Sequence, residues 1–281
     1  MTNQVQNKWK NKGKATTNDI HNKKRKSVKL KSNICWIDDY SKEICINPVG
    51  RYANQYDKLG QLKSMYFGEK KYKISIPIKS NGELTVEVRF KVIAKLSGAE
   101  LTNDEKKSKK IDDLSSAKTK LIDGINKFWN NRFSINIIDP LCGKKIYPIK
   151  YIAKWVETDE HYKMIVHDSY PREGVTGLRL DVSNSTTDWV YAHEFGHCLG
   201  LPDEYSYTAD TETVKYYKPD RSLGAPISAP PDGKDAAASD ATIMAAYGCT
   251  KTKKRHAWNI AIEARDLLSE KIGRAIKCEI L

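Results

Sequence analysis

The alternation of hydrophobic and polar residues predicts a chain rich in β-strands. Residues 72–78 (YKISIPI) and 83–95 (ELTVEVRFKVIAK) alternate with the period of two that is typical of a half-buried strand. Residues 33–48 alternate less regularly and are expected to form a small hairpin. The other β-rich runs are 133–139, 146–156, 162–167 and 175–182.

Three segments repeat their apolar residues at intervals of three and four instead, which predicts amphipathic helices. The first covers residues 111–130 and follows a charged run, Lys106 to Lys110, that we expect to be a loop. The second runs from Trp189 to Leu199, after the sequence SNSTTD, whose side chains favour the start of a helix. The third covers 256–276, and residues 205–240 between the last two are expected to be irregular.

Composition and charge describe an ordinary globular protein with a basic tail. Of 281 residues, 40% are hydrophobic and 30% are charged, which excludes a collagen-like or wholly disordered chain. The net charge is +13, but residues 1–31 hold ten basic side chains and one acid. We therefore expect residues 1–31 to be a solvated, disordered tail, with a contact to nucleic acid, anionic lipid or a cell-wall polymer as the alternative. The folded body is not expected to bind nucleic acid.

The sequence gives few signs of targeting. No apolar run approaches the roughly 18 residues of a membrane-spanning helix, so we expect no membrane span. Basic residues near the N-terminus are not followed by an apolar stretch, so we expect no secretory signal peptide. Six cysteines occur without a CxxC pair, which argues against a cysteine zinc cluster, and most are expected to be small core residues.

The segment 193–203, HEFGHCLGLPD, carries the candidate chemistry. His193 and His197 are four residues apart, so on a helix both imidazoles project from one face and can bind one Zn²⁺. Glu194 is displaced around the helix and is placed to take a proton from a water molecule rather than to bind the metal.

A third ligand is expected shortly after the helix. Gly200 allows the helix to end, because glycine accepts a positive φ, and Asp203 then brings a carboxylate back to the metal. Glu204, the next residue, is the alternative third ligand. Two histidines and one carboxylate leave a position open for water, which is the arrangement of a catalytic zinc site.

These residues resemble a known family. HEFGHCLGLPD resembles the metzincin signature HExxHxxGxxH with its last His replaced by Asp, and is similar to the HExxHxxGLPD motif of snapalysin-type bacterial proteases. The resemblance implies a methionine turn below the zinc, which the sequence ATIMAAYG around Met244 fits. It also implies a catalytic tyrosine, for which Tyr247 is the candidate, three residues after Met244 rather than two. A packed aromatic is the alternative for Tyr247.

The resemblance further implies an α+β fold for residues 83–281: a twisted mixed sheet with two packed helices, the active-site helix, the Met turn and a C-terminal helix. A small β-rich region of unknown role, 32–82, would precede this catalytic domain. In the family, the strand corresponding to 162–167 is the sheet edge at which a peptide substrate pairs as an added strand. We also expect Cys198 in the core and His256 at the surface, with a position at the active site as the alternative for His256.

Together these features predict a zinc-dependent endopeptidase acting on a protein or peptide substrate, with Glu194 as general base. One alternative is an exported antibacterial effector that cleaves cell-wall peptides with the same site, is delivered by a dedicated secretion system and has a cognate inhibitor protein. Another is a non-catalytic, zinc-stabilised binding module, against which the presence of Glu194 counts.

Overall fold

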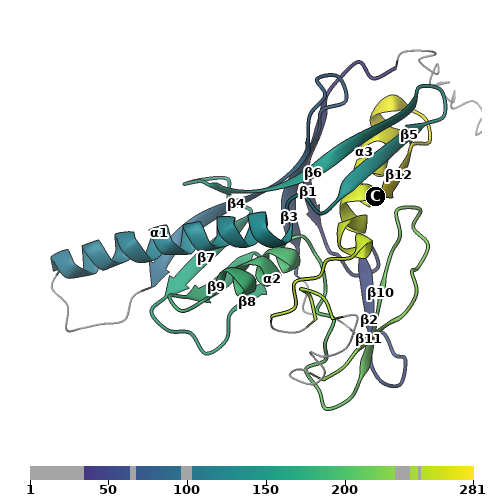
Figure 1. Ribbon diagram of the computed structural model, residues 1–281. Helices are drawn as coiled ribbons and strands as arrows, with labels where there is room; N and C mark the ends of the chain where they lie inside the picture. Colours follow the sequence, from purple (N-terminus) through teal and green to yellow (C-terminus); the bar gives the residue numbers. More distant parts are fainter. Residues whose placement is uncertain (1–34, 64–67, 96–102, 232–240, 246–247) are drawn as a thin grey trace, which may run out of the picture.

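The structure is a computed structural model that describes residues 35–63, 68–95, 103–231, 241–245 and 248–281. Its main element is a mixed sheet of nine strands (Figure 1). Seven of them follow one another across the sheet in the order β12 (Lys277–Ile280), β5 (Ser134–Asp139), β6 (Gly143–Trp155), β4 (Leu84–Lys95), β7 (Tyr162–His167), β9 (Arg179–Ser183) and β8 (Gly174–Thr176).

The sheet ends beside the candidate site at β8, not at β7. β7 pairs in parallel with β4 on one side and with β9 on the other, so the expectation that 162–167 forms the sheet edge is wrong. The run 175–182 was expected to be one strand but forms two, β8 and β9, which pair antiparallel. Gly177, with φ of 57°, makes the turn between them.

The N-terminal region contributes strands to two sheets. β3 (Lys70–Ile76) pairs antiparallel with the first half of β4, and β1 (Tyr40–Ile46) pairs with β3. β1 is a single strand, so the hairpin expected over 33–48 does not form within its described part. The boundary proposed at residue 82 stays a prediction.

Two strands that follow the motif, together with one strand from the N-terminal region, form a small second sheet. Its order is β11 (Ile227–Ala229), β10 (Glu212–Tyr216) and β2 (Ala53–Tyr56). The expectation that 205–240 is irregular is therefore wrong for β10 and β11, whereas the other described residues of this range belong to no helix or strand. The strand ETVKY was missed because its alternation covers only five residues.

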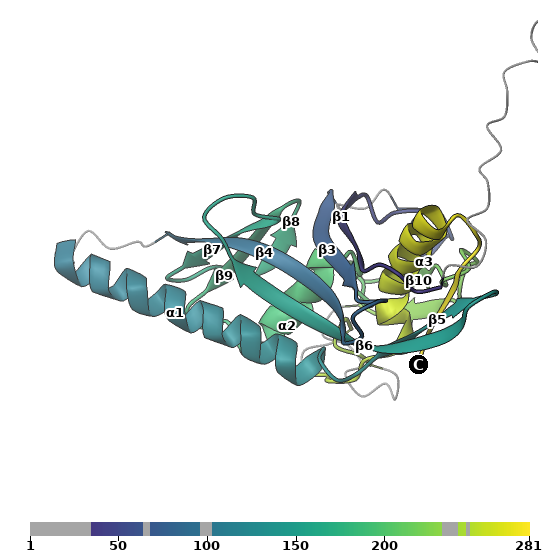
Figure 2. The ribbon, with the colours of Figure 1, turned by 90° about the horizontal axis from the view of Figure 1, so that it is seen from above.

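Two helices pack together on one face of the main sheet, α1 (Asn103–Phe128) and α2 (Asp188–Cys198) (Figures 1 and 2). α1 includes the run Lys106 to Lys110, which was expected to be a loop, because Asp104 and Glu105 in its first turn favour a helix start there. Gly124 allows the close approach of the two helices, since a Cβ there would collide with the carbonyl oxygen of Asp188.

The C-terminal helix lies on the other side of the site. A short 3-10 turn, η1 (Lys254–Ala257), leads into α3 (Trp258–Ile272), which packs against β1, β3 and β12. The helix expected over 256–276 is thus shorter than predicted, because Gly273 ends it in the left-handed conformation, with φ of 79°.

The cysteines serve different purposes. Cys35 and Cys142 form a disulfide that ties the residues before β1 to the turn between β5 and β6. Cys198 and Cys278 are buried, as expected for Cys198. The expectation that most of the six cysteines are core residues is wrong, because the other four are partly or fully exposed. Cys45 is exposed.

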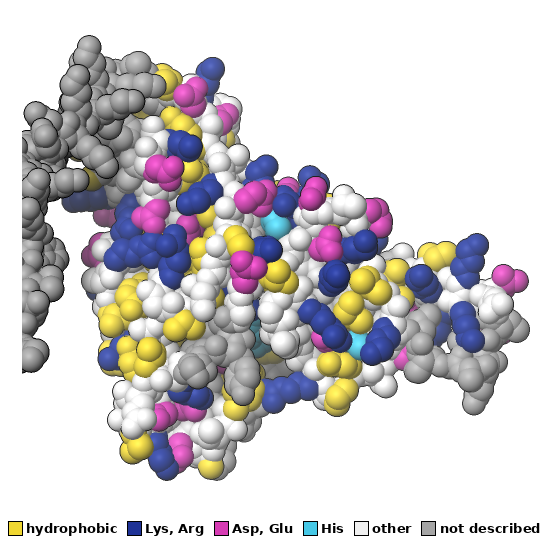
Figure 3. All heavy atoms as spheres, turned by 180° about the vertical axis from the view of Figure 1, so that it is seen from behind, with side chains coloured by type: hydrophobic (Ala, Val, Ile, Leu, Met, Phe, Trp, Pro, Cys, Tyr) yellow, Lys and Arg dark blue, Asp and Glu magenta, His cyan; other side chains and the backbone are white. Residues whose placement is uncertain are grey.

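The surface seen in Figure 3 carries interspersed Lys, Arg, Asp and Glu side chains. Within the described residues, no helix combines the length and the apolar character needed to cross a membrane. The described residues therefore form a mixed α+β arrangement with a few helices around one main sheet.

Candidate metal centre

Helix α2 presents the motif to a cavity. Thr187 caps its N-terminus, with the side-chain oxygen accepting a hydrogen bond from the Val190 amide at 3.4 Å, as the SNSTTD sequence predicts. The helix ends at Cys198 with Leu199 as its C-cap, and Gly200 follows with φ of 86°, as expected for the residue that turns the chain back. Residues Tyr191 to Cys198 are all buried, so the C-terminal two turns of the helix are held in place by packing.

His193, His197 and Asp203 converge on one point. The Nε2 atoms of the two histidines are 3.1 Å apart, and each lies 3.1 Å from Oδ1 of Asp203. Four ligands arranged as a tetrahedron around Zn²⁺ at bond lengths of about 2.0–2.1 Å are about 3.3 Å from one another. The spacing of the three atoms therefore fits one zinc ion.

Backbone carbonyls fix the orientation of both imidazoles. His193 Nδ1 donates to the carbonyl of Ile243 at 2.7 Å, and His197 Nδ1 donates to the carbonyl of Leu201 at 2.8 Å. A carbonyl oxygen only accepts, so a neutral imidazole carries its proton at Nδ1 and leaves the Nε2 lone pair directed at the shared point.

The surroundings of Asp203 favour a cation between its carboxylate and the two imidazoles. Its Oδ1 is buried and accepts no hydrogen bond from the described residues, although it faces two imidazoles. A buried carboxylate oxygen without a donor is costly. Burial opposes charge on His193, yet the adjacent Asp203 carboxylate outweighs it and raises the pKa of His193 to about 9. A bound metal ion would take the place of that proton.

Met244 lies under the two histidines. It is fully buried, and a Cβ at Gly196 would lie 2.5 Å from its sulfur atom. Gly196 directly precedes His197 on the helix, and because it has no side chain it leaves room for the thioether of Met244. The methionine turn expected around Met244 stays a prediction.

Glu204, the alternative third ligand, faces away from the histidines. Its carboxylate accepts hydrogen bonds from Arg255 Nε at 2.7 Å and Thr242 Oγ1 at 2.6 Å, and lies 3.1 Å from His256 Nε2. His256 is fully buried, so the expectation that it is a surface residue is wrong. The geometry thus favours Asp203 over Glu204 as the third ligand.

Two tyrosines that the sequence analysis did not single out complete the surroundings of Asp203. The Tyr207 hydroxyl donates to Asp203 Oδ2 at 2.6 Å and lies 3.2 Å from the Tyr205 hydroxyl. The guanidinium of Arg172 lies 4.5 Å from the centre of the Tyr207 ring. Their position two and four residues after Asp203 is the signal that could have found them.

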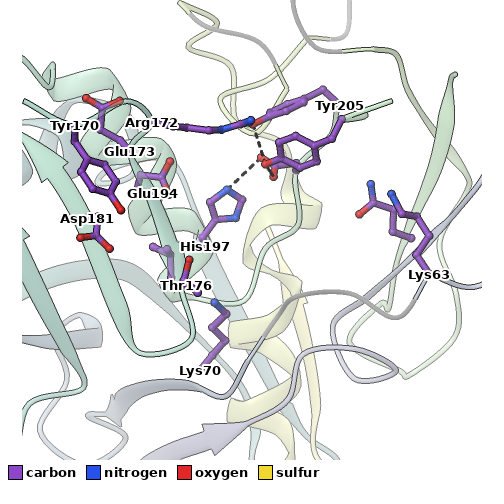
Figure 4. Close-up of a pocket in the computed structure, with 15 residues that line it drawn as sticks. Lys63, Lys70, Tyr170, Arg172, Glu173, Thr176, Asp181, Glu194, His197 and Tyr205 are labelled. Carbon is purple, nitrogen blue, oxygen red and sulfur yellow. Dashed lines mark hydrogen bonds and ion pairs between the residues drawn. The ribbon is translucent and has the colours of Figure 1, made fainter. Parts of the chain in front are cut away.

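A cavity of about 520 Å³ opens over these groups, lined among others by Glu194, His197 and Asp203. Figure 4 shows the Glu194 carboxylate beside the His197 ring, with Tyr170 and Glu173 on the β8 side and Tyr205 opposite. Oε2 of Glu194 is buried and has no hydrogen-bond partner among the described residues, so it is available to a molecule in the cavity. Tyr247, the other catalytic candidate, lies outside the described residues.

Comparison with known proteins agrees with this geometry. The family model described as immune inhibitor A peptidase M6, catalytic domain, matches residues 181–224, which include the end of β9, all of α2 and the HEFGHCLGLPD motif. No curated protein and no solved structure matches the chain. The match supports a metallopeptidase, a hydrolase that acts on peptides or proteins and depends on a metal ion, typically zinc.

Proposed function

We propose that the protein is a zinc-dependent endopeptidase whose metal is held by His193, His197 and Asp203. The single observation that carries this proposal is the convergence of two Nε2 lone pairs and an unsatisfied carboxylate oxygen at 3.1 Å from one another. Zinc bound there would act as a Lewis acid toward a water molecule and the carbonyl of the scissile peptide bond.

Glu194 performs the proton transfers. As general base it takes a proton from the attacking water, and it then gives that proton to the nitrogen of the leaving amine as the peptide bond breaks. Its position on α2 next to His193 keeps its carboxylate in the cavity without making it a fourth ligand.

The substrate would lie along β8. Gly174, Val175 and Thr176 of this edge strand line the cavity, and an edge strand offers its backbone amides and carbonyls to an extended peptide. This proposal replaces β7, whose two edges are both occupied by neighbouring strands.

The direct test substitutes Glu194 by Gln and measures hydrolysis of casein. We expect kcat/KM to fall by about 10²–10⁴-fold, because a positioned general base contributes that factor, while the zinc content stays that of the wild type. Glu270→Gln, the same change at an exposed position of α3, is the control and should keep full activity. Full activity of Glu194→Gln would contradict the proposal.

The effector and the binding-module alternatives are separated by the choice of substrate. Hydrolysis of purified cell-wall sacculi but not of casein would favour cleavage of cell-wall peptides by the same site. A wild-type protein that binds zinc and cleaves neither substrate would favour the non-catalytic module.

A further inference from the structure

One lysine lies on the inner face of the main sheet. In β3, Lys70 has the same phase as Tyr72, Ile74 and Ile76, which are all buried, and it is itself only 1% exposed. Lysine is rarely buried to this extent, because its ammonium group loses favourable contact with water. Its position therefore calls for a group of opposite charge nearby.

The side chain of Lys70 lines the cavity described above. Glu194 and His197 line the same cavity although they are only 6% and 7% exposed. Low exposure therefore does not exclude Lys70 from the cavity wall. Figure 4 shows the Lys70 side chain directed toward His197 and Thr176. The ammonium group thus belongs to the wall opposite the loop that carries Tyr205.

Burial lowers the pKa of Lys70, and the nearby Glu194 carboxylate acts in the opposite direction. An ammonium has three N–H donors, so it can keep a contact within the protein and still donate to a bound molecule. A carboxylate that enters a poorly solvated cavity gains more from such a donor than it would in water.

Two further acidic side chains that line the cavity are engaged in specific contacts. Glu173 accepts hydrogen bonds from Ser183 and Thr186, and Asp181 contacts His167 and Arg179.

We propose that Lys70 binds a carboxylate of the substrate, so that the enzyme prefers to cleave peptides beside an acidic residue. This inference rests on the proposed endopeptidase activity and names a substrate class for it. The cavity of about 520 Å³ falls in the range of about 300–1,000 Å³ that is typical of ligand pockets, so it has room for a substrate side chain.

The test begins with wild-type protein and a mixed library of synthetic peptides, whose cut sites are read by mass spectrometry. A quenched fluorogenic peptide with the best-cut sequence is then compared in two forms, with Glu or with Gln at the enriched position. We expect the wild type to favour the Glu peptide by about tenfold or more in kcat/KM, as a charge-assisted hydrogen bond would give.

Variants of two neighbouring lysines assign the preference to its source. Lys70→Met should bring the ratio of the two kcat/KM values to about one, and Lys70→Arg should restore part of it. Lys71→Met is the matched control, because it removes the same charge from the other face of β3, where Lys71 contacts Glu69. This control should keep the wild-type ratio.

Three outcomes would overturn the inference. Equal cleavage of the Glu and Gln peptides by the wild type would exclude an acidic preference, and this comparison needs no variant to fold. A Lys70→Met protein that loses activity equally on both peptides would show that Lys70 acts on Glu194 rather than on the substrate. A wild type that cleaves no peptide would overturn the proposed function, and this inference with it.

Discussion

Asp203 and Glu204 are adjacent acids with opposite surroundings. Asp203 faces two imidazoles, and its Oδ1 has no hydrogen-bond donor in the part of the chain that the structure describes, whereas Glu204 accepts from Arg255 and Thr242. From the sequence, either acid could be the third ligand. Beyond the end of a helix, the position of a residue in the sequence does not determine where its side chain points. The partners that distinguish them lie about 40 and 50 residues further along the chain.

Tyr207 holds the second oxygen of the same carboxylate, although its side chain is 56% exposed. We predict that Tyr207→Phe raises the dissociation constant for zinc about tenfold, because hydrogen bonds to a ligand's outer atoms typically contribute at least that factor. Competition for zinc against a chromophoric chelator measures the effect.

The control for this prediction is Tyr217→Phe. It also removes a hydroxyl, but one that accepts a hydrogen bond from Asn54 at 3.1 Å rather than touching Asp203. Zinc affinity should stay at the wild-type value in this variant. An unchanged affinity in Tyr207→Phe would show that the hydrogen bond to Asp203 does not position the carboxylate for the metal.

The loop after α2 is tied to the rest of the protein through Glu204, which is 2% exposed. It connects this loop to β10 through the Tyr216 hydroxyl, to the turn at Thr242 and to η1 through Arg255. Its amide also donates to the Met244 carbonyl at 2.7 Å. Burial alone would raise the pKa of Glu204, but the charge of His256 and the hydrogen bonds from Arg255 outweigh burial and hold the pKa well below its usual value.

This direction determines how stability should depend on pH. A carboxylate with a lowered pKa in the folded state stabilises that state fully above its unfolded pKa of about 4.3, and less as the pH falls below it. For the metal-free protein we predict that Glu204→Gln lowers the free energy of unfolding by about 3 kcal/mol at pH 7. The difference from the wild type should shrink as the pH falls from 5 toward 3.

Urea denaturation followed by circular dichroism measures this difference at each pH. Glu270→Gln at the exposed surface of α3 should show no comparable loss at any pH. A loss for Glu204→Gln that is the same at pH 7 and pH 3 would contradict an ionised Glu204 as its source.

The elements that hydrophobic periodicity predicted best are those whose pattern is long or bounded by clear signals. The strand expected at 162–167 has those limits in the structure, and α2 begins at Asp188, the last of its predicted capping residues. Short elements were missed or merged: β10 has too few alternations, and Gly177 divides the run 175–182 into β8 and β9. The position of β7 inside the sheet depends on pairing between distant segments, which periodicity does not report.

For the molecule as a whole, the local part of the candidate site was predictable and the long-range part was not. The HExxH spacing on one helix fixes the relative positions of His193 and His197 without help from the rest of the chain. Lys70 reaches the same cavity from β3, and the residues next to it in the sequence do not predict that it lies there. The one available signal was that Lys70 occupies the apolar phase of its strand.

The most direct test of this account is the zinc content of the purified protein, measured by native mass spectrometry. We predict one zinc ion per chain in the wild type and in Glu194→Gln, and none in His197→Ala or Asp203→Ala at equal zinc concentration. A wild type without zinc, or zinc retained in both His197→Ala and Asp203→Ala, would contradict a metal centre built from His193, His197 and Asp203.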